Sequence, residues 1–493
     1  MLLLGIDVGT SSIKVSVLDA ANGKCIVSTQ YPETETGIIS LHKDWAEQSP
    51  DDWWQHVQQA IVKANATKLY NPKDIKAIGI AYQMHGLVLV NKQQQVLRNS
   101  IIWCDSRAVE IGDKAFHAIG EERCLSHLLN SPGNFTASKL KWVKDNEPSI
   151  YNQIDKVLLP GDFIAMKLTG KTSTSISALS EGIFWDFKKN QLSADVMNYY
   201  GLDASFIPTI NDVFAVQGNV TKEVAAALSL TENIPVAYKA GDQPNNALSL
   251  NVLQPGEVAA TAGTSGVIYG VSDRLSYDPQ SRVNSFAHVN HTASQNRIGV
   301  LLCINGTGIL NRWVKNLAGA ALSYQQINDV ASPINPGSDG LMVLPFGNGA
   351  ERMLNNKTIA AHIQQIDLNK HSNAHLFRAA QEGIAFAFRY GLDIMRSNQL
   401  QPSVIRAGKA NMFLSKVFTD AFVNATGVSV ELYNGDGSVG AAIGAGIGAK
   451  VYSDPKQAFQ NFKPIETVHP TNTALYDEGY QQWKQLLNKQ LHS

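Results

Sequence analysis

A short pattern that occurs twice constrains the fold of this 493-residue chain more than any other feature: an apolar run, a Gly-Thr-Ser corner, then a β-rich run. The first copy covers residues 7–12 and the second covers residues 261–266. Their glycines are separated by about half of the chain. A repeat at this spacing indicates two similar halves that each open with a β-hairpin. We therefore predict two α/β domains, residues 1–248 and residues 249–493.

The residues around the first copy predict the first elements of that fold. Three β-rich runs, at residues 2–8, 13–18 and 25–28, are separated by turn residues and predict a β-meander. Ser49 precedes Pro50 and two acidic residues, and apolar residues at helical spacing follow. This order of a capping residue, a proline and acidic residues is typical of the beginning of a helix. Strands and helices are therefore expected to alternate.

A run of small residues near the end of the chain begins at Gly440 and includes Gly444, Gly446 and Gly448. It lacks the full GxGxxG spacing of a dinucleotide-binding turn. A run this rich in alanine and glycine is better explained as a helix that packs very closely on a neighbour.

Charge and cysteine content exclude several classes of protein. The 41 Lys and Arg residues nearly balance the 42 Asp and Glu residues, so no bulk positive charge attracts nucleic acid or an acidic membrane surface. No window approaches the roughly 20 apolar residues of a membrane-spanning helix. The four cysteines form no CxxC pair, so neither a disulfide framework nor a zinc site is indicated. We expect a cytoplasmic protein without nucleic-acid or membrane partners.

The two Gly-Thr-Ser corners are candidate phosphate-binding sites. Such a corner exposes backbone N–H groups and hydroxyls that donate hydrogen bonds to phosphate oxygens. Alone, each corner is explained as well by an ordinary hairpin turn, but the repeat favours two corners that grip a triphosphate from both sides. Asp7, before the first corner, is a candidate ligand of a hydrated magnesium ion, with a capping role as the alternative. The corner residues are Gly9, Thr10, Ser11, Gly263, Thr264 and Ser265.

Asp242 is the candidate general base. It follows Gly241 and an apolar run at residues 234–237, and the flexible glycine lets the side chain enter a cleft. A carboxylate there can accept the proton of a substrate hydroxyl that attacks a γ-phosphate. The alternative is that Asp242 caps a helix over residues 245–250.

A second group of candidates lies at strand ends and suits a polyol. Gln83, Met84 and His85 follow an expected strand at residues 75–81 and offer an amide, a thioether and an imidazole. Polar groups of this kind hydrogen-bond hydroxyls, while the thioether shields carbon atoms. A further cluster, at residues 103–107, either adds to this pocket or forms an internal ion pair; it contains Trp103, Asp105 and Arg107.

These motifs resemble those of the FGGY carbohydrate kinases, and within that family those of the xylulokinases. The resemblance extends over nearly the whole chain. The matching motifs lie at residues 5–14, 45–48, 83–86, 102–107, 135–140, 241–243, 263–266 and 351–352.

The resemblance implies two actin-like (ribonuclease H-like) domains with a catalytic cleft between them, and Asp242 as the general base. The residues implied to bind the sugar are Gln83, Met84, His85, Trp103, Asp105, Asn134, Asp242 and Gln243. Those implied to bind ATP are Gly9, Thr10, Ser11, Lys14, Gly263, Thr264, Ser265, Gly408, Lys409 and Asn411. Asp7 and Asp242 are implied to bind magnesium. The adenine is expected near residues 408–411, against the glycine-rich helix from Gly437 onward.

The implied reaction is the ATP- and Mg²⁺-dependent phosphorylation of a ketose hydroxyl, with D-xylulose and ATP giving D-xylulose 5-phosphate and ADP. Met84 and His85 favour xylulose, because glycerol kinases usually carry Arg-Glu at that place. The segment around Asp242 partly resembles glycerol kinases, so ribulose, glycerol and gluconate stay open as acceptors. An actin-like switch ATPase is the alternative from another class, and such a protein has no need of a polyol pocket. Homodimers are common in the family and are part of the expectation.

Overall fold

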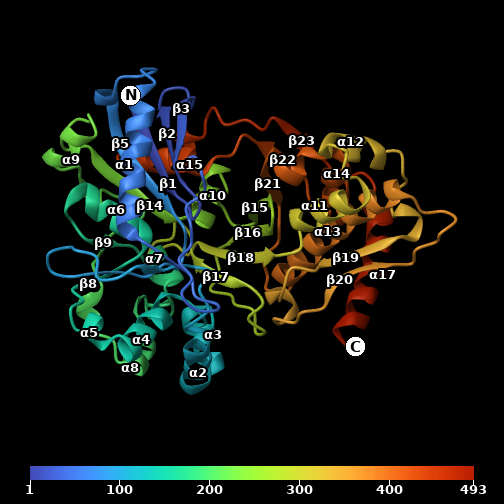
Figure 1. Ribbon diagram of the computed structural model, residues 1–493, viewed down its shortest axis with the longest axis horizontal. Coiled ribbons are helices and arrows are strands. Elements are labelled where there is room, and N and C mark those ends of the chain that lie inside the picture. The colour runs from blue at the N-terminus through green and yellow to red at the C-terminus, as the bar shows by residue number, and fades with distance from the viewer. Residues whose placement is uncertain (493) are drawn as a thin grey trace.

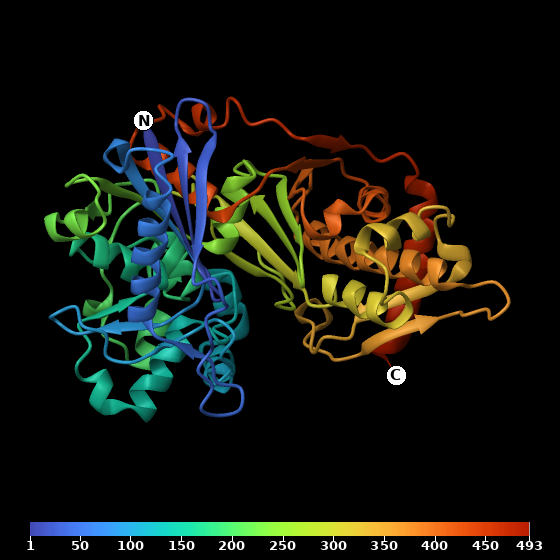
Figure 2. The same ribbon diagram turned by 45° about the horizontal axis from the view of Figure 1, so that its top comes forward.

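The structure, a computed structural model, describes residues 1–492 and contains two large sheets side by side (Figures 1 and 2). The first sheet has the strand order β13-β14-β5-β1-β2-β3, and the second has the order β17-β18-β16-β15-β21-β22-β23. In each sheet three neighbouring antiparallel strands are joined by two strands that run parallel to the first of them. This shared order confirms the predicted α/β fold with two related, actin-like halves.

The strands of the first sheet confirm the predicted meander and the predicted strand at residues 75–81. They are β1 (Leu2–Val8), β2 (Ile13–Asp19), β3 (Cys25–Tyr31), β5 (Ile75–Tyr82), β13 (Gly218–Asn219) and β14 (Pro235–Gly241). The strands of the second sheet are β15 (Glu257–Ala262), β16 (Gly266–Ser272), β17 (Asn284–Ala287), β18 (Ile298–Ile304), β21 (Val404–Gly408), β22 (Val430–Tyr433) and β23 (Glu466–Val468).

Helix α1 (Pro50–Ala66) begins where the sequence predicts. The Ser49 hydroxyl accepts a hydrogen bond from the Asp52 amide at 3.2 Å, and the buried face of the helix includes Trp53 and Ile61. This capping bond satisfies one of the amides that the first turn leaves without a helical partner.

The chain between β5 and β14 forms a helical layer with short two-stranded ladders. Its helices are α2 (Val109–Ile119), α3 (Glu121–Leu128), α4 (Thr136–Asn146), α5 (Pro148–Tyr151), α6 (Pro160–Thr169), α7 (Ile176–Glu181), α8 (Ala194–Tyr200) and α9 (Lys222–Ala227). The short strands of the first half are β4 (Glu47–Gln48), β6 (Val88–Val90), β7 (Ser100–Ile101), β8 (Lys156–Leu158), β9 (Ser173–Thr174), β10 (Trp185–Asp186), β11 (Gln191–Leu192) and β12 (Thr209–Ile210).

The second half packs its helices around α13, which is buried along most of its length. The helices from residue 242 onward are α10 (Asp242–Ser249), α11 (Gly308–Ala318), α12 (Tyr324–Ala331), α13 (Asn373–Ser397), α14 (Lys416–Thr426), α15 (Gly437–Gly448), α16 (Pro455–Ala458) and α17 (Thr473–Leu491), and a hairpin is formed by β19 (Met342–Phe346) and β20 (Ala360–Gln364). Among residues 1–492, no helix is both long and apolar enough to span a membrane.

Helix α15 comes from the second half of the sequence but packs on the first sheet, where Figure 1 shows it beside β1. A side chain at Gly5 would collide with the Ser438 carbonyl, and one at Gly79 would collide with the Ala441 carbonyl. The prediction that the small-residue run is a closely packed helix is therefore confirmed. Because this helix crosses between the halves, the division at residues 248 and 249 stays a prediction.

The edge strand β17 forms a second connection between the halves. The Asn130 side chain exchanges two hydrogen bonds with the backbone of Ser285, at 2.6 Å and 2.9 Å. On α7, the Ser177 hydroxyl donates to the Ala287 carbonyl, and the Ala287 amide donates to the Ser180 hydroxyl. The two halves therefore meet both at α15 and at the strand that follows the second hairpin.

Candidate active site

Three strands of the first sheet place the predicted catalytic residues at one edge. Because β1, β5 and β14 run parallel, their carboxyl ends meet there. Asp7 lies near the end of β1, Gln83 to His85 follow β5, and Asp242 directly follows β14 as the first residue of α10. The fold thus brings together the candidate base, the candidate magnesium ligand and part of the candidate sugar pocket.

Asp7 and Asp242 are neighbouring desolvated carboxyl groups. Burial, and secondly the negative charge of Asp7, raise the pKa of Asp242 to about 7, although hydrogen bonds from Gln243 oppose the shift. Burial and the charge of Asp436 likewise raise the pKa of Asp7 to about 6. Helix α10 is capped by Gly241 without a side-chain bond, so the alternative role of Asp242 as a helix cap is not supported. Two carboxylates that repel one another in a site shielded from water offer the oxygen ligands that a magnesium ion binds.

Asp436 is a third acidic residue of this edge, and sequence reasoning missed it. It caps α15 by accepting hydrogen bonds from the Ser438 amide and hydroxyl, at 2.9 Å and 2.6 Å, and it forms an ion pair with Lys14. Burial alone would raise its pKa, but the bonds from Lys14 and Ser438 hold that pKa below the usual value. A side chain at Gly437 would collide with the Asp7 carboxylate, so this helix end lies directly over Asp7. The capping position before the small-residue run was the available signal.

The first Gly-Thr-Ser corner is held in place by side chains around it. The Thr10 hydroxyl donates to Oε1 of Gln83 at 3.2 Å, and it accepts from the Trp103 indole at 3.0 Å. The Gln48 amide donates to the Thr10 carbonyl at 2.8 Å and accepts from Nε2 of Gln83 at 3.1 Å. Gln83 is buried in this network, whereas Trp103 remains 54% exposed. Gln83 therefore braces the corner in this structure, and its contact with a substrate stays a prediction.

His85 has a fixed orientation and a neutral ring. Its Nδ1 lies 3.0 Å from the Glu181 carbonyl, which can only accept, so Nδ1 carries the proton and Nε2 is left as an acceptor. Burial, and then the positive charge of Lys139, lower the pKa of His85 to about 3. Phe135 and Phe286 hold the ring at centroid distances of 4.8 Å and 5.3 Å. Because Phe286 belongs to β17, both halves of the molecule shape this pocket.

Glu181 is a buried acid next to His85 that sequence reasoning also missed. Its Oε2 lies 3.8 Å from the His85 ring, and neither carboxylate oxygen has a hydrogen-bond partner. Burial raises the pKa of Glu181 well above the usual value. The nearby Tyr82 phenol opposes this shift, although its position does not give a hydrogen bond to the carboxylate. Met84 and Glu181 both lie close to Gly241. A side chain at position 241 would collide with Met84.

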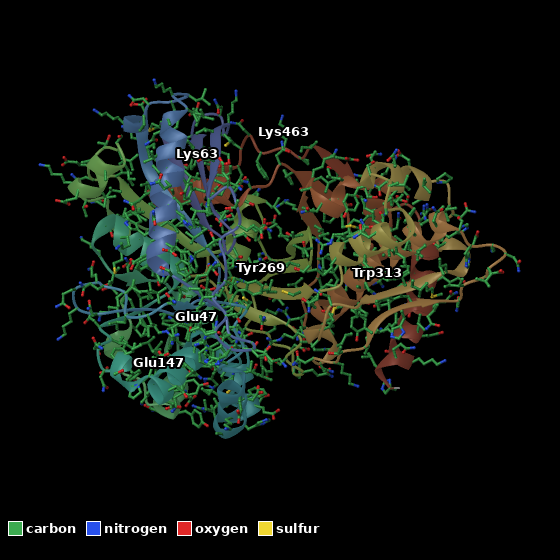
Figure 3. All side chains as sticks on the ribbon, viewed as in Figure 1. Glu47, Lys63, Glu147, Tyr269, Trp313 and Lys463 are labelled. Atoms are coloured by element: carbon green, nitrogen blue, oxygen red, sulfur yellow. The ribbon has the colours of Figure 1, made fainter. Side chains whose placement is uncertain are left out.

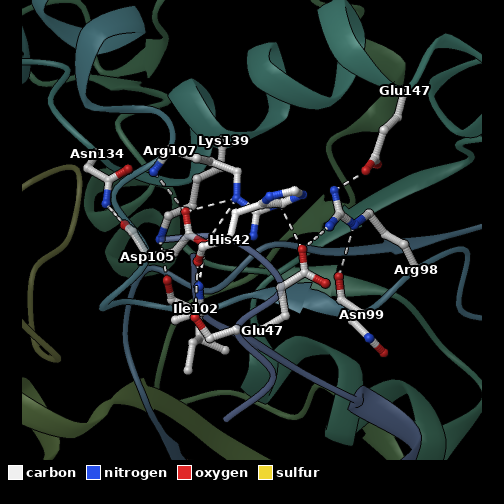
Figure 4. Close-up of polar contacts among 12 residues, drawn as sticks. His42, Glu47, Arg98, Asn99, Ile102, Asp105, Arg107, Asn134, Lys139 and Glu147 are labelled. Atoms are coloured by element: carbon white, nitrogen blue, oxygen red, sulfur yellow. Dashed lines mark hydrogen bonds and ion pairs between the residues drawn. The ribbon is translucent and has the colours of Figure 1, made fainter. Parts of the chain in front are cut away.

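For residues 103–107 the structure supports the ion-pair alternative for two of the three side chains (Figure 4). Asp105 is fully buried and accepts from Nε and Nη2 of Arg107, at 3.0 Å and 2.7 Å, and from the Ala46 amide at 2.6 Å. Arg107 also pairs with Glu47 at 2.7 Å. The Asn134 amide donates to the Asp105 carbonyl. Asp105 and Asn134 therefore support the pocket wall, and their direct contact with a sugar stays a prediction.

The ion pairs extend away from the pocket through a second arginine. Arg98 pairs with Glu47 and, at 2.7 Å, with Glu147 on the outer side of the first half (Figure 3). The guanidinium of Arg107 also lies 3.7 Å from the ring centroid of Trp45. These contacts fix the segment that carries Trp103.

Two cavities lie beside the loop at residues 408–411. One, of about 490 Å³, is lined by Gly263, Thr264 and Asn411 together with α11 and α12. The other, of about 530 Å³, is lined by Gly408 and Lys409 and by the first turn of α15. Both have the size of small-molecule sites. The Lys409 ammonium pairs with Glu466 at 2.9 Å, so it is already engaged.

The chain is similar to known proteins over nearly its whole length. Residues 2–249 match the family model described as the FGGY family of carbohydrate kinases, N-terminal domain. The xylulose kinase of Escherichia coli K12 is 29% identical over 486 residues, covering 96% of this chain and 95% of that protein.

Solved structures share the fold but differ in their substrates. The xylulose kinase from Rhodospirillum rubrum is 23% identical with a TM-score of 0.88, covering 100% of both chains. The gluconate kinase from Lactobacillus acidophilus is 21% identical with a TM-score of 0.89, covering 100% of this chain and 98% of that chain. The fold alone therefore does not select the acceptor.

Proposed function

Because the chain belongs to the FGGY family of carbohydrate kinases, we propose that it transfers the γ-phosphate of ATP to D-xylulose and releases D-xylulose 5-phosphate and ADP. The observation that carries this proposal is the desolvated Asp242 beside Met84 and the neutral His85 at one sheet edge. Similarity to a xylulose kinase over nearly the whole chain supports the choice of sugar.

Asp242 removes the proton from the attacking hydroxyl. A pKa of about 7 leaves this carboxyl group partly ionised at neutral pH and basic enough to accept the proton during attack. The unprotonated Nε2 of His85 can accept a hydrogen bond from another sugar hydroxyl, while Met84 covers carbon atoms. The Trp103 indole, which bonds Thr10, lies where the sugar and the first corner meet.

Asp7 and Asp242 would hold the magnesium ion, since both are oxygen donors with a raised pKa and neither has an ion-pair partner at 4.0 Å or less within residues 1–492. When bound, the ion would screen the phosphate charges. The Lys14 ammonium, 42% exposed and paired with Asp436, lies at the same edge and can turn to a phosphate.

We place the adenosine in the cavity of about 490 Å³. This cavity includes Gly263 and Thr264 of the second corner, so a nucleotide there has its phosphates at the corner and can extend them toward Asp7. The cavity of about 530 Å³ contains no residue of that corner. Asn411 is therefore the expected adenosine contact, and Lys409 is not.

We expect the protein to work in the cytoplasm as a homodimer. The four cysteines are all unpaired, which supports a reducing cytoplasm. A homodimer stays a prediction.

The test is ADP release by purified protein with ATP and magnesium against D-xylulose, D-ribulose, L-ribulose, glycerol and gluconate. Strong stimulation by D-xylulose alone is the expected result. Preference for another polyol would keep the kinase and refute the sugar. Turnover that no polyol stimulates would refute the proposal and favour a switch ATPase.

A further inference from the structure

Lys139 is a buried cation whose ammonium bonds to the backbone of two loops. It is fully buried, and its ammonium donates to the His85 carbonyl at 2.9 Å. It also donates to the Ile102 carbonyl at 2.9 Å (Figure 4). A fully buried lysine is rare unless it is paired with an acid, and neither of these partners is one.

The two carbonyls belong to the segments that present the candidate sugar contacts. His85 has a φ of 62°, a left-handed conformation that a residue with a side chain rarely adopts without support. Ile102 directly precedes Trp103. One side chain from the first turn of α4 thus joins the loop after β5 to the loop after β7.

This position is energetically expensive. Burial lowers the pKa of Lys139 to about 7, and the nearby charge of Asp105 only partly compensates. Two hydrogen bonds to carbonyl oxygens offset part of this cost. The two loops are also bridged nearby, where the Leu87 amide donates to the Ile101 carbonyl at 3.0 Å, and the Lys139 bonds extend this connection to His85 and Ile102.

We infer that Lys139 is a positioning residue for the acceptor sugar, because it holds the backbone of His85 and Ile102 and thereby sets the spacing between the His85 imidazole and the Trp103 indole. The inference rests on the proposed function, in which these two side chains face the sugar. It assigns Lys139 no contact with the substrate. Loosening the loops is expected to weaken sugar binding, while the adenosine cavity, which is lined by residues of the second half, keeps its shape.

The test compares Lys139→Met with a matched variant of the other fully buried lysine. Lys239 pairs with Asp162 at 2.6 Å and also donates to Ser173 rather than to either loop, and the double variant Asp162→Asn/Lys239→Met removes that pair without leaving a lone charge. Lys139→Met is expected to raise the KM for the acceptor about tenfold or more, equivalent to about 1.4 kcal/mol. The KM for ATP should change less than twofold, and the control should change neither.

Lys139→Gln keeps N–H donors on a shorter side chain, so it is expected to restore part of the sugar affinity. It also carries the test if Lys139→Met does not fold. An unchanged KM for the acceptor would overturn the inference, as would equal losses for both substrates in step with the melting temperature. Wild-type protein is assayed first with the polyol panel: if no polyol is phosphorylated, the proposed function fails and this inference with it, whereas an active wild type with an unaffected variant refutes the inference alone.

Discussion

Replacing Asp242 by asparagine should make the protein less active and more stable. The amide cannot accept the hydroxyl proton, and loss of a general base typically costs 10²–10⁴-fold in rate, or about 3–5 kcal/mol at about 1.4 kcal/mol per factor of ten. The folded state, in contrast, should gain stability, because it no longer contains a desolvated carboxylate at this position. The rise in pKa from 3.8 to about 7 corresponds to roughly 4 kcal/mol against the ionised form. Because Asp242 is only half-buried, we expect a smaller gain of about 2 kcal/mol.

The pH dependence gives this prediction its sign. An acid whose pKa is raised in the folded state binds its proton more tightly there, so folding is favoured at low pH and that contribution is lost as the pH rises through about 7. The stability difference between Asp242→Asn and wild type should therefore grow from near zero at pH 4 to its full value at pH 8. Urea unfolding without nucleotide or magnesium measures it, and ADP release measures the rate.

Asp436→Asn is the matched control with the opposite sign. Lys14 and Ser438 hold the pKa of Asp436 below its usual value, so this variant should be less stable than wild type at neutral pH, and the loss should disappear on acidification. If Asp242→Asn destabilised the protein at pH 8, or kept turnover within tenfold of wild type, the assignment of a desolvated base would be wrong.

Three further predictions test other parts of the structure. Gly79→Ala places a methyl group against the Ala441 carbonyl and should cost about 1–3 kcal/mol in urea unfolding; an unchanged midpoint would contradict the close contact of α15 with the sheet. In wild type, burial raises the pKa of Glu181, so its ionisation lowers the free energy of unfolding by up to about 1.4 kcal/mol per pH unit as the pH rises. Glu181→Gln should remove this fall, and parallel pH profiles for both proteins would contradict the prediction. Gly308→Ala adds a methyl group against the Gly263 carbonyl and should raise the KM for ATP about tenfold with little effect on the KM for the sugar; equal KM values for ATP would refute the choice of adenosine cavity.

Sequence by itself determined the elements that depend on neighbours along the chain. The repeated strand and corner predicted the two related halves, because hairpins and hydrophobic alternation are local properties of the backbone. Ser49 and Pro50 predicted the start of α1 for the same reason. The position of Asp242 directly after a strand also placed it at a sheet edge, since parallel strands end together.

Only the tertiary structure decided which distant side chains meet. Asp436 reaches Lys14 because a helix from the second half packs on the first sheet through Gly5 and Gly79. Long-range packing also brings Lys139 to its two acceptors, which lie on separate loops. It likewise brings Gln83 to Thr10, so that Gln83 supports the first corner. These contacts depend on long-range packing, which residue spacing along the sequence does not encode. Whether a segment is a helix or a strand depends on local periodicity, which the spacing does encode.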